Sequence, residues 1–340
     1  MGGLARKANI INEEKKKGSN VLVFDTGDTF FLEEHKYDAD TRKIHADIIA
    51  KSYSMMGCNA LSPGSRDFSE FGVSDLDLLA EKSSTDFISC NVYDSSKRIL
   101  HEPYGMLDID GFKIAYIGAS SVFQDSMLHI KDPISQIRNT VNKISEESDF
   151  IILLFNGTDS DLDRLQKTDI DIDMVLFSKT KGQTNSQASS NGGNKRIPVF
   201  TSGNRGKYLN RIDVSIKERK SKLLDISKQK NNIKASRKFL DNKNKLNTKD
   251  VSLEEFFKDN KKVLKDISRH KLKISSSQDK IDNAINSFET IKVALNSKVG
   301  NDPDILSLVE EGMAKIVKGP PGGKDHKGRL PSHPHHGHNH

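Results

Sequence analysis

Asp25 and Asp28 directly follow a short apolar run, in the stretch VLVFDTGDTF that covers residues 21–30. A continuous apolar run that ends in Asp, Thr and Gly predicts a buried strand with polar side chains at its carboxyl end. Ligands of α/β sheets bind at that end. We therefore expect Asp28 to be the first functional candidate of the chain.

Histidine is the other residue type whose spacing suggests chemistry. A short imidazole-rich tract at the C-terminus, preceded by His326, contains His333, His335, His336, His338 and His340. Deprotonated imidazoles of this kind bind Ni²⁺, Cu²⁺ or Zn²⁺. Because the tract has no fixed geometry, we expect buffering or incidental binding, and the interrupting glycine, proline and asparagine argue against an expression tag. Four further histidines have no metal-ligand spacing and are expected to be surface or satisfied residues: His35, His45, His101 and His129.

Strand-like and helical segments alternate over the first two thirds of the chain, which predicts an α/β layered domain. The expected helices are 2–17, 41–56, 72–82, 133–147 and 160–167. The expected strands are 21–24, 59–61, 87–92, 106–109, 112–117, 150–155, 174–177, 197–201 and 208–216, with loops at 62–67 and 180–194.

The composition changes at residue 217. Residues 217–298 contain 22 Lys or Arg against 11 Asp or Glu, whereas the rest of the chain is net acidic. Apolar residues recur every seven positions, including Ile267, Ile274, Ile281 and Phe288. This period predicts a helical hairpin of 218–246 and 252–298 with coiled-coil character. Polar seam residues make it a weak coil, or one that associates with itself or with a partner helix.

The overall composition sets further limits. The chain has 340 residues but is only 34% hydrophobic, so part of it is expected to be non-globular or elongated. Cys58 and Cys90 form no zinc signature, and we expect two buried thiols. No apolar stretch approaches a membrane span, and no secretory signal follows Met1. If Met1 is the true start, the protein is cytoplasmic.

The order of several motifs resembles one family, the two-metal metallophosphatase (calcineurin-like phosphoesterase) domain of bacterial 5′-nucleotidases and UDP-sugar hydrolases. The resemblance covers residues 1–216, and its blocks are GGLAR, VFDTGDTF, NALSPGSRDF, ISCNVYD, IILLFNGTD, DIDMVLFSKTKG and GNRGKYLNRIDVSI. It implies a two-sheet sandwich flanked by helices, with two metals at the strand ends. It also implies a periplasmic or extracytoplasmic location.

The resemblance implies a metal site that this sequence retains only in part. The Asp-x-His block that precedes GGLAR in the family is absent, and Asp28 matches the bridging aspartate. Ser65 and Arg66 stand where Asn and His are expected, next to Asp67, and Asn156 stands where a histidine is expected. Lys179 and Lys181 replace both histidines of Gly-His-x-His. Asp28 and a weakly coordinating Asn156 do not hold two divalent cations.

Two interpretations of these replacements stay open. In one, Arg66, Lys179 and Lys181 are structural counter-ions for Asp28, since a buried carboxylate must be paired. In the other, Ser65 and these cations form a pocket that binds phosphate or a nucleotide without hydrolysis.

The sequence thus predicts a two-sheet metallophosphatase-like domain over 1–216, a basic helical hairpin over 217–300, a short helix over 301–318 and a disordered tail over 319–340. The leading hypothesis is a degenerate binding or scaffold module with no metal in its site. One alternative is an active phosphoesterase with an altered or truncated site that uses Mn²⁺ or Zn²⁺. Another is an extracytoplasmic accessory protein with a metal-binding tail. Nucleic acid is disfavoured as a partner of the hairpin, because acidic residues are interspersed and aromatics are scarce.

Overall fold

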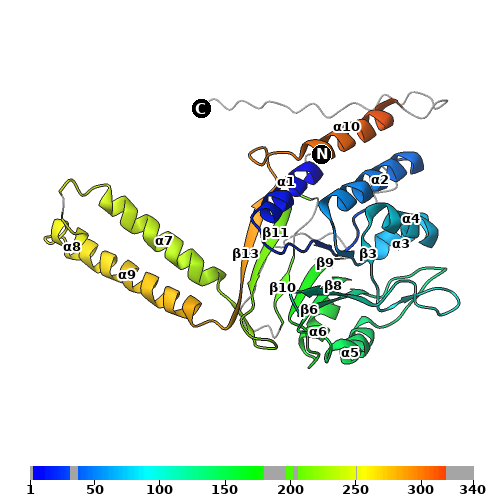
Figure 1. The fold of residues 1–340 in the computed structure, drawn as a ribbon, viewed down its shortest axis with the longest axis horizontal. Helices are drawn as coiled ribbons and strands as arrows, with labels where there is room; N and C mark the ends of the chain where they lie inside the picture. Colours follow the sequence, from blue (N-terminus) through cyan, green and yellow to red (C-terminus); the bar gives the residue numbers. More distant parts are fainter. Residues whose placement is uncertain (1–2, 31–36, 180–196, 202–205, 250, 319–340) are drawn as a thin grey trace.

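The computed structural model describes residues 3–30, 37–179, 197–201, 206–249 and 251–318. Helices and strands alternate through the body of the molecule, as the sequence predicts (Figure 1). The helices of the body are α1 (Gly3–Lys16), α2 (Ala39–Met56), α3 (Ser65–Phe71), α4 (Val73–Ser83), α5 (Pro133–Ile144), α6 (Asp159–Gln166) and α10 (Pro303–Lys318).

The larger sheet has five strands in the order β10-β9-β8-β6-β5. Only β5 and β6 pair antiparallel, around the turn at Asp110 and Gly111, and the other neighbours are parallel. Its strands are β5 (Tyr104–Ile109), β6 (Phe112–Ser120), β8 (Phe150–Gly157), β9 (Met174–Lys179) and β10 (Val199–Phe200). Every residue of β8 is buried, which explains its unbroken apolar sequence.

The other strands form three smaller sheets. Strands β1 (Phe24–Asp25), β2 (Ala60–Leu61) and β3 (Asp86–Phe87) pair in parallel. Strands β4 (Val92–Tyr93) and β7 (His129–Ile130) form an antiparallel pair. The third sheet has the order β11-β13-β12 and contains β11 (Tyr208–Ser215), β12 (Leu223–Asp225) and β13 (Asn286–Ala294).

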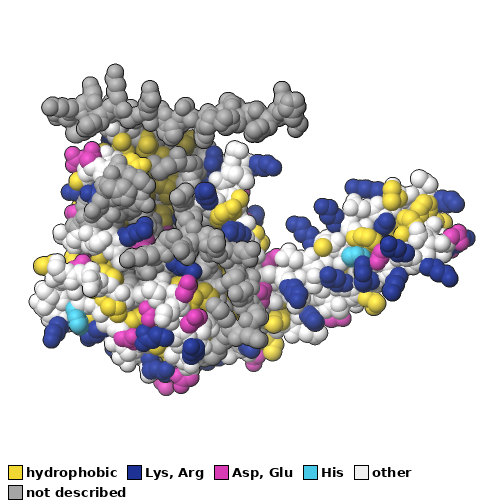
Figure 2. Space-filling model, turned by 180° about the vertical axis from the view of Figure 1, so that it is seen from behind, with side chains coloured by type: hydrophobic (Ala, Val, Ile, Leu, Met, Phe, Trp, Pro, Cys, Tyr) yellow, Lys and Arg dark blue, Asp and Glu magenta, His cyan; other side chains and the backbone are white. Residues whose placement is uncertain are grey.

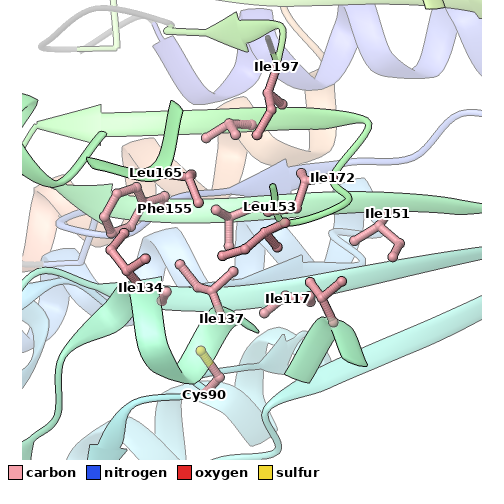
Figure 3. Packing of buried hydrophobic residues seen from close by; sticks show 14 of the residues in the cluster. Cys90, Ile117, Ile134, Ile137, Ile151, Leu153, Phe155, Leu165, Ile172 and Ile197 are labelled. Atoms are coloured by element: carbon pink, nitrogen blue, oxygen red, sulfur yellow. The ribbon is translucent and has the colours of Figure 1, made fainter. Parts of the chain in front are cut away.

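Three apolar clusters hold these elements in layers. One lies between the five-stranded sheet and α5 and α6, where Leu153 and Phe155 of β8 lie close to Ile137 of α5 (Figure 3). A second joins α1, α2, α4 and α10 to the sheet that contains β1. The third lies between the sheets and includes Leu154 of β8 and Phe288 of β13. The body is therefore a mixed α/β sandwich with helices on both outer sides.

The helical hairpin projects from this body as an arm (Figure 1). It consists of α7 (Ser227–Asn244), α8 (Leu253–Phe256) and α9 (Lys261–Asp282). The expectation that the second helix extends over 252–298 is wrong, because 286–294 forms β13 and pairs antiparallel with β11. Leu223 likewise lies in β12, not in a helix. The sheet therefore joins residues from both sides of position 217.

The structure also bears on the expected cysteines, on the loop after β2 and on membrane-crossing segments. Cys58 and Cys90 are free and buried, as expected. The loop expected at 62–67 is wrong at its end, because α3 begins at Ser65. Among the described residues, none of the helices has the length and apolar character that crossing a membrane requires. The loop 180–194 and the tail 319–340 lie outside the described residues.

Candidate active-site region

The loop that follows β1 turns sharply at Gly27 and Asp28. Both residues have a positive φ, +81° for Gly27 and 55° for Asp28. A Cβ atom at Gly27 would overlap the backbone of Ser62 and Gly64, so this position admits only glycine. The turn brings the loop after β1 against the loop after β2, and this contact places Asp28 next to the start of α3.

Asp67 fastens these two loops together. Its carboxylate is completely buried and accepts four backbone N–H bonds. Asp28 N and Gly64 N donate to Oδ2 over 2.7 and 2.8 Å, and Thr29 N and Phe30 N donate to Oδ1 over 3.1 and 3.4 Å. Burial first, and then the Asp28 carboxylate, raise the pKa of Asp67 to about 7. Both carboxylate oxygens are therefore used by the fold itself.

Asp25 has a similar structural role on the other side of the loop. Its Oδ1 accepts hydrogen bonds from Gly27 N at 3.0 Å and from the Thr29 hydroxyl at 2.7 Å. Its Oδ2 accepts the Tyr53 hydroxyl of α2 at 2.6 Å. Lys7 of α1 in turn donates to the Tyr53 hydroxyl at 3.2 Å. Burial and the Asp25 charge raise the pKa of Tyr53 well above its ordinary value.

Asp28 and Asn156 face each other beside Gly64. Oδ1 of Asp28 accepts the backbone N–H of Arg66 at 3.0 Å, and a Cβ atom at Gly64 would overlap both Asp28 and Asn156. Asn156, at the end of β8, donates from Nδ2 to the Thr26 carbonyl at 3.1 Å. Its Oδ1 is buried without a hydrogen-bond partner. Burial raises the pKa of Asp28, whereas the Arg66 N–H, Asn156 and the Arg66 charge oppose this rise.

The structure brings together some of the candidate residues and separates others. Ser65 and Arg66 open α3, beside Asp28, and the Arg66 side chain is exposed. Lys179, at the end of β9, forms an ion pair of 2.7 Å with Asp159 at the start of α6. The expectation that a lysine is the partner of Asp28 is therefore wrong for Lys179. Lys181 and the tail candidates lie outside the described residues: His333, His335, His336 and His338.

These residues do not fit a two-metal centre. Two cations about 3.5–4 Å apart need a shared carboxylate and several further ligands. Each carboxylate oxygen of Asp67 and Asp25 accepts at least one hydrogen bond from the surrounding loops and α2, whereas Oδ1 of Asn156 is buried without a hydrogen-bond partner. Across the described ranges, no three His, Cys, Asp or Glu side chains are grouped so as to hold a metal ion.

The sandwich and the position of these strand-end loops define a metallophosphatase-like fold. Solved structures of that class share it. SoxB, a sulfate thiohydrolase of Thermus thermophilus, superimposes on 92% of the chain with a TM-score of 0.59 and 12% identity. YfkN, a calcineurin-like phosphoesterase of Bacillus subtilis, matches 92% of this chain with a TM-score of 0.57 and 16% identity. The 5′-nucleotidase of Candida albicans matches 93% of this chain with a TM-score of 0.51 and 10% identity.

These similarities establish the fold alone, because identities of 10–16% are too low to carry a conclusion about activity. The chain spans 47% of the SoxB structure and 52% of the Candida nucleotidase, but 88% of the YfkN structure. No protein-family model and no curated protein matches the sequence. The structural comparison nevertheless agrees with the resemblance that the motif order carries.

Sequence reasoning missed Asp25 and Tyr53 as members of this cluster. Asp25 belongs to the same strand-end run as Asp28, so its proximity could have been anticipated. Tyr53 follows the helical spacing of α2 and is indistinguishable there from an ordinary core residue. Only the packing of α2 against β1 shows that its hydroxyl reaches a carboxylate.

Proposed function

We propose that this chain is a catalytically degenerate metallophosphatase-like protein that acts as a binding or scaffold module. The observation that carries the proposal is that the strand-end carboxylates accept hydrogen bonds from the protein itself. Asp25 and Asp67 are hydrogen-bonded to the loops that hold them, and Asp28 faces an amide and an arginine backbone N–H. A hydrolytic centre needs carboxylate oxygens that point at metal ions and substrate.

The positive charges of the site support the same proposal. Arg66 lies close enough to Asp28 for its charge to oppose the rise of the pKa of Asp28. A protein cation beside the one remaining ligand competes with a metal ion for the same carboxylate. We therefore propose that Arg66 is a counter-ion for Asp28, which is the structural interpretation of the sequence replacements.

The direct test is an assay of the full chain after incubation with Mn²⁺ or Zn²⁺. The substrates are nucleoside monophosphates and a generic phosphodiester, and bound metal is measured on the same samples. We expect no turnover above buffer. Turnover that Asp28→Ala abolishes and Asp110→Ala leaves intact would refute degeneracy and support the alternative, an active metal-dependent phosphoesterase. Asp110 is the matched control because it lies in the exposed turn between β5 and β6.

Phosphate or nucleotide binding without hydrolysis is the second proposal for this region. The expected pocket consists of Ser65, Arg66, Lys179 and Lys181, but the ammonium group of Lys179 is already paired with Asp159. Calorimetric titration with inorganic phosphate and with AMP tests this proposal. Binding that disappears in Lys179→Ala/Lys181→Ala supports it, whereas binding that persists in this double variant places the ligand elsewhere.

A role as an extracytoplasmic accessory protein with a metal-binding tail also stays a proposal. It depends on the histidines of 319–340, and the sequence alone supports it. Its test is metal retention by the full chain and by a chain that ends at residue 318.

A further inference from the structure

The arm has a thin seam between its two long helices. The buried side chains of α7 are Ile233 and Ser236, and those of α9 are Ile267 and Ser277. Helices that pack on a core ordinarily bury three or four residues in every two turns. For their lengths of 18 and 22 residues, α7 and α9 bury few side chains completely, although they contact each other through Phe239, Ser236 and His270.

A shallow groove of about 670 Å³ lies between α7 and the C-terminal part of α9. The groove is lined by five cations of α7 and its C-cap, namely Lys230, Lys234, Arg237, Lys238 and Lys245. Figure 2 shows Lys and Arg side chains spread over the arm. Lys230 forms an ion pair with Glu289 of β13. In the described parts of the chain, the other four have no ion pair.

These four cations without an ion pair lie on α7 and at its C-cap, where they repel one another. Lys234 and Lys238 are four residues apart, and like charges at this spacing destabilise a helix. Asp241 is the one acidic residue among those that line the groove. An anionic partner would relieve the repulsion, so the groove has the charge of a docking surface for an acidic ligand.

The groove also has apolar side chains. Ile233 of α7 is buried at its floor, and Ile281 of α9 is partly buried and lines it. Apolar residues flanked by cations match a helix with an apolar stripe and acidic edges. A flat bilayer surface does not enter a groove of this kind.

Single-stranded nucleic acid fits the groove less well, because it binds through free aromatic faces. The Phe239 ring stacks on His270 with 4.1 Å between centroids. Phe256 and Phe257 pack edge to face against each other. Aromatic rings are absent from the residues that line the groove.

We propose that an acidic amphipathic helix of a partner protein docks in this groove and packs beside α7 and α9 as the third long helix of the arm. Its apolar stripe packs on Ile233 and Ile281, and its Asp and Glu residues pair with Lys234, Arg237 and Lys238. The groove follows α7, whose 18 residues span about 27 Å. The partner helix therefore needs a similar length. This proposal rests on the proposed scaffold role and names the partner for it.

The test uses the full chain and a labelled synthetic peptide of about 20 residues, a length matched to α7. The peptide has Leu and Ile in a heptad pattern and Glu at the flanking positions. We expect saturable binding by fluorescence anisotropy, weakening with added salt, and a gain of helical circular dichroism. Lys234→Glu/Arg237→Glu/Lys238→Glu is expected to weaken binding about tenfold or more.

The matched control carries the same charge change outside the groove, on α9: Lys261→Glu/Lys265→Glu/Lys273→Glu. Both triple variants alter exposed side chains, and circular dichroism verifies their folding. The control is expected to bind the peptide within about twofold of the parent chain, because none of these three lysines lines the groove. Ile281→Ser tests the apolar floor and is expected to weaken binding without a change in salt dependence.

Equal losses in both triple variants would overturn the proposal, because binding would then depend on net charge alone. Binding of a single-stranded oligonucleotide or of phosphatidylserine vesicles, but not of the peptide, would overturn it as well. The result is separable from that of the phosphoesterase assay. If the chain shows Asp28-dependent turnover and still binds the peptide, catalytic degeneracy is refuted and the docking proposal stands. If the chain is inactive and does not bind the peptide, only the docking proposal is refuted.

Discussion

The buried carboxyl group of Asp67 gives the loop cluster a measurable dependence on pH. Burial and the neighbouring Asp28 raise its pKa from 3.8 to about 7. In the unfolded chain the group has an ordinary pKa, so between about pH 4 and 7 the folded protein holds a proton that the unfolded chain has released. Folding is therefore favoured at the acidic end of this interval, and the free energy of unfolding falls as the pH rises through it.

The size of the effect follows from the same two values. The interval from 3.8 to about 7 covers about three pH units. Each unit corresponds to about 1.4 kcal/mol, so the contribution of Asp67 changes by about 4 kcal/mol. Asp67→Asn has no titratable group at this position and loses this contribution. The difference in stability between the two chains is therefore the quantity that reports on Asp67.

The assay is urea unfolding, followed by circular dichroism, at several pH values from about 5 to 8. We expect the parent chain to lose stability relative to Asp67→Asn as the pH rises. Asp110→Asn is the control, because it makes the same change in an exposed turn, and its difference from the parent should be flat. A difference between the parent and Asp67→Asn that is flat, or that changes in favour of the parent at high pH, would refute this reasoning.

The titration of Asp67 is coupled to that of Asp28, because the Asp28 charge is one cause of the raised pKa of Asp67. Asp28→Asn removes that charge. We expect the pH range in which stability falls to move toward lower pH in this variant. An unchanged range would show that burial alone sets the titration.

Three further predictions concern the same loops and the C-terminal tract. Gly64→Ala places a Cβ against Asp28 and should cost about 2 kcal/mol in urea unfolding, whereas Gly300→Ala, whose Cβ meets the Asn9 side chain only at an ordinary contact distance of 3.5 Å, should cost less than about 0.5 kcal/mol. Tyr53→Phe leaves one oxygen of Asp25 without its hydroxyl donor and should cost about 1–3 kcal/mol in the same assay; no loss would mean that water replaces the hydroxyl. Removal of 319–340 should abolish retention on a Ni²⁺ resin without changing the unfolding midpoint, and equal retention would place the metal ligands elsewhere.

Local patterns predicted the elements whose burial follows from their own sequence. The apolar run of β8 predicts a central strand because all of its residues face the interior. The stop of α2 at Gly57, which has a left-handed φ of 65°, is also evident locally. Such elements need no knowledge of distant partners.

Pairing between distant strands determined the structure of segments whose local sequence pattern suggested a helix. Phe288 continues the heptad spacing of α9, yet it lies in β13 because Val214 of β11 is its strand partner. One residue in seven cannot distinguish a helix from a strand, since a buried strand also places apolar residues inward at intervals. The second arm helix was therefore predicted too long at its C-terminal end.

The candidate site shows the same division. The spacing of Gly64 and Asp67 indicates a loop motif, and the motif order indicates the fold class. That Asp67 accepts N–H groups from residues 37 to 39 positions earlier is a fact of tertiary structure. The sequence therefore located the cluster but did not predict that its acids are occupied.

The hydrogen bonds of this cluster connect the strand-end loops to the elements that pack around them. Here Asp67 joins the loop after β1 to α3, Asp25 joins it to α2 through Tyr53, and Asn156 joins it to β8. These bonds fix the loop after β1 relative to α2, α3 and β8. The strand-end acids of this cluster therefore have a structural role in the fold, which the proposed binding or scaffold role requires.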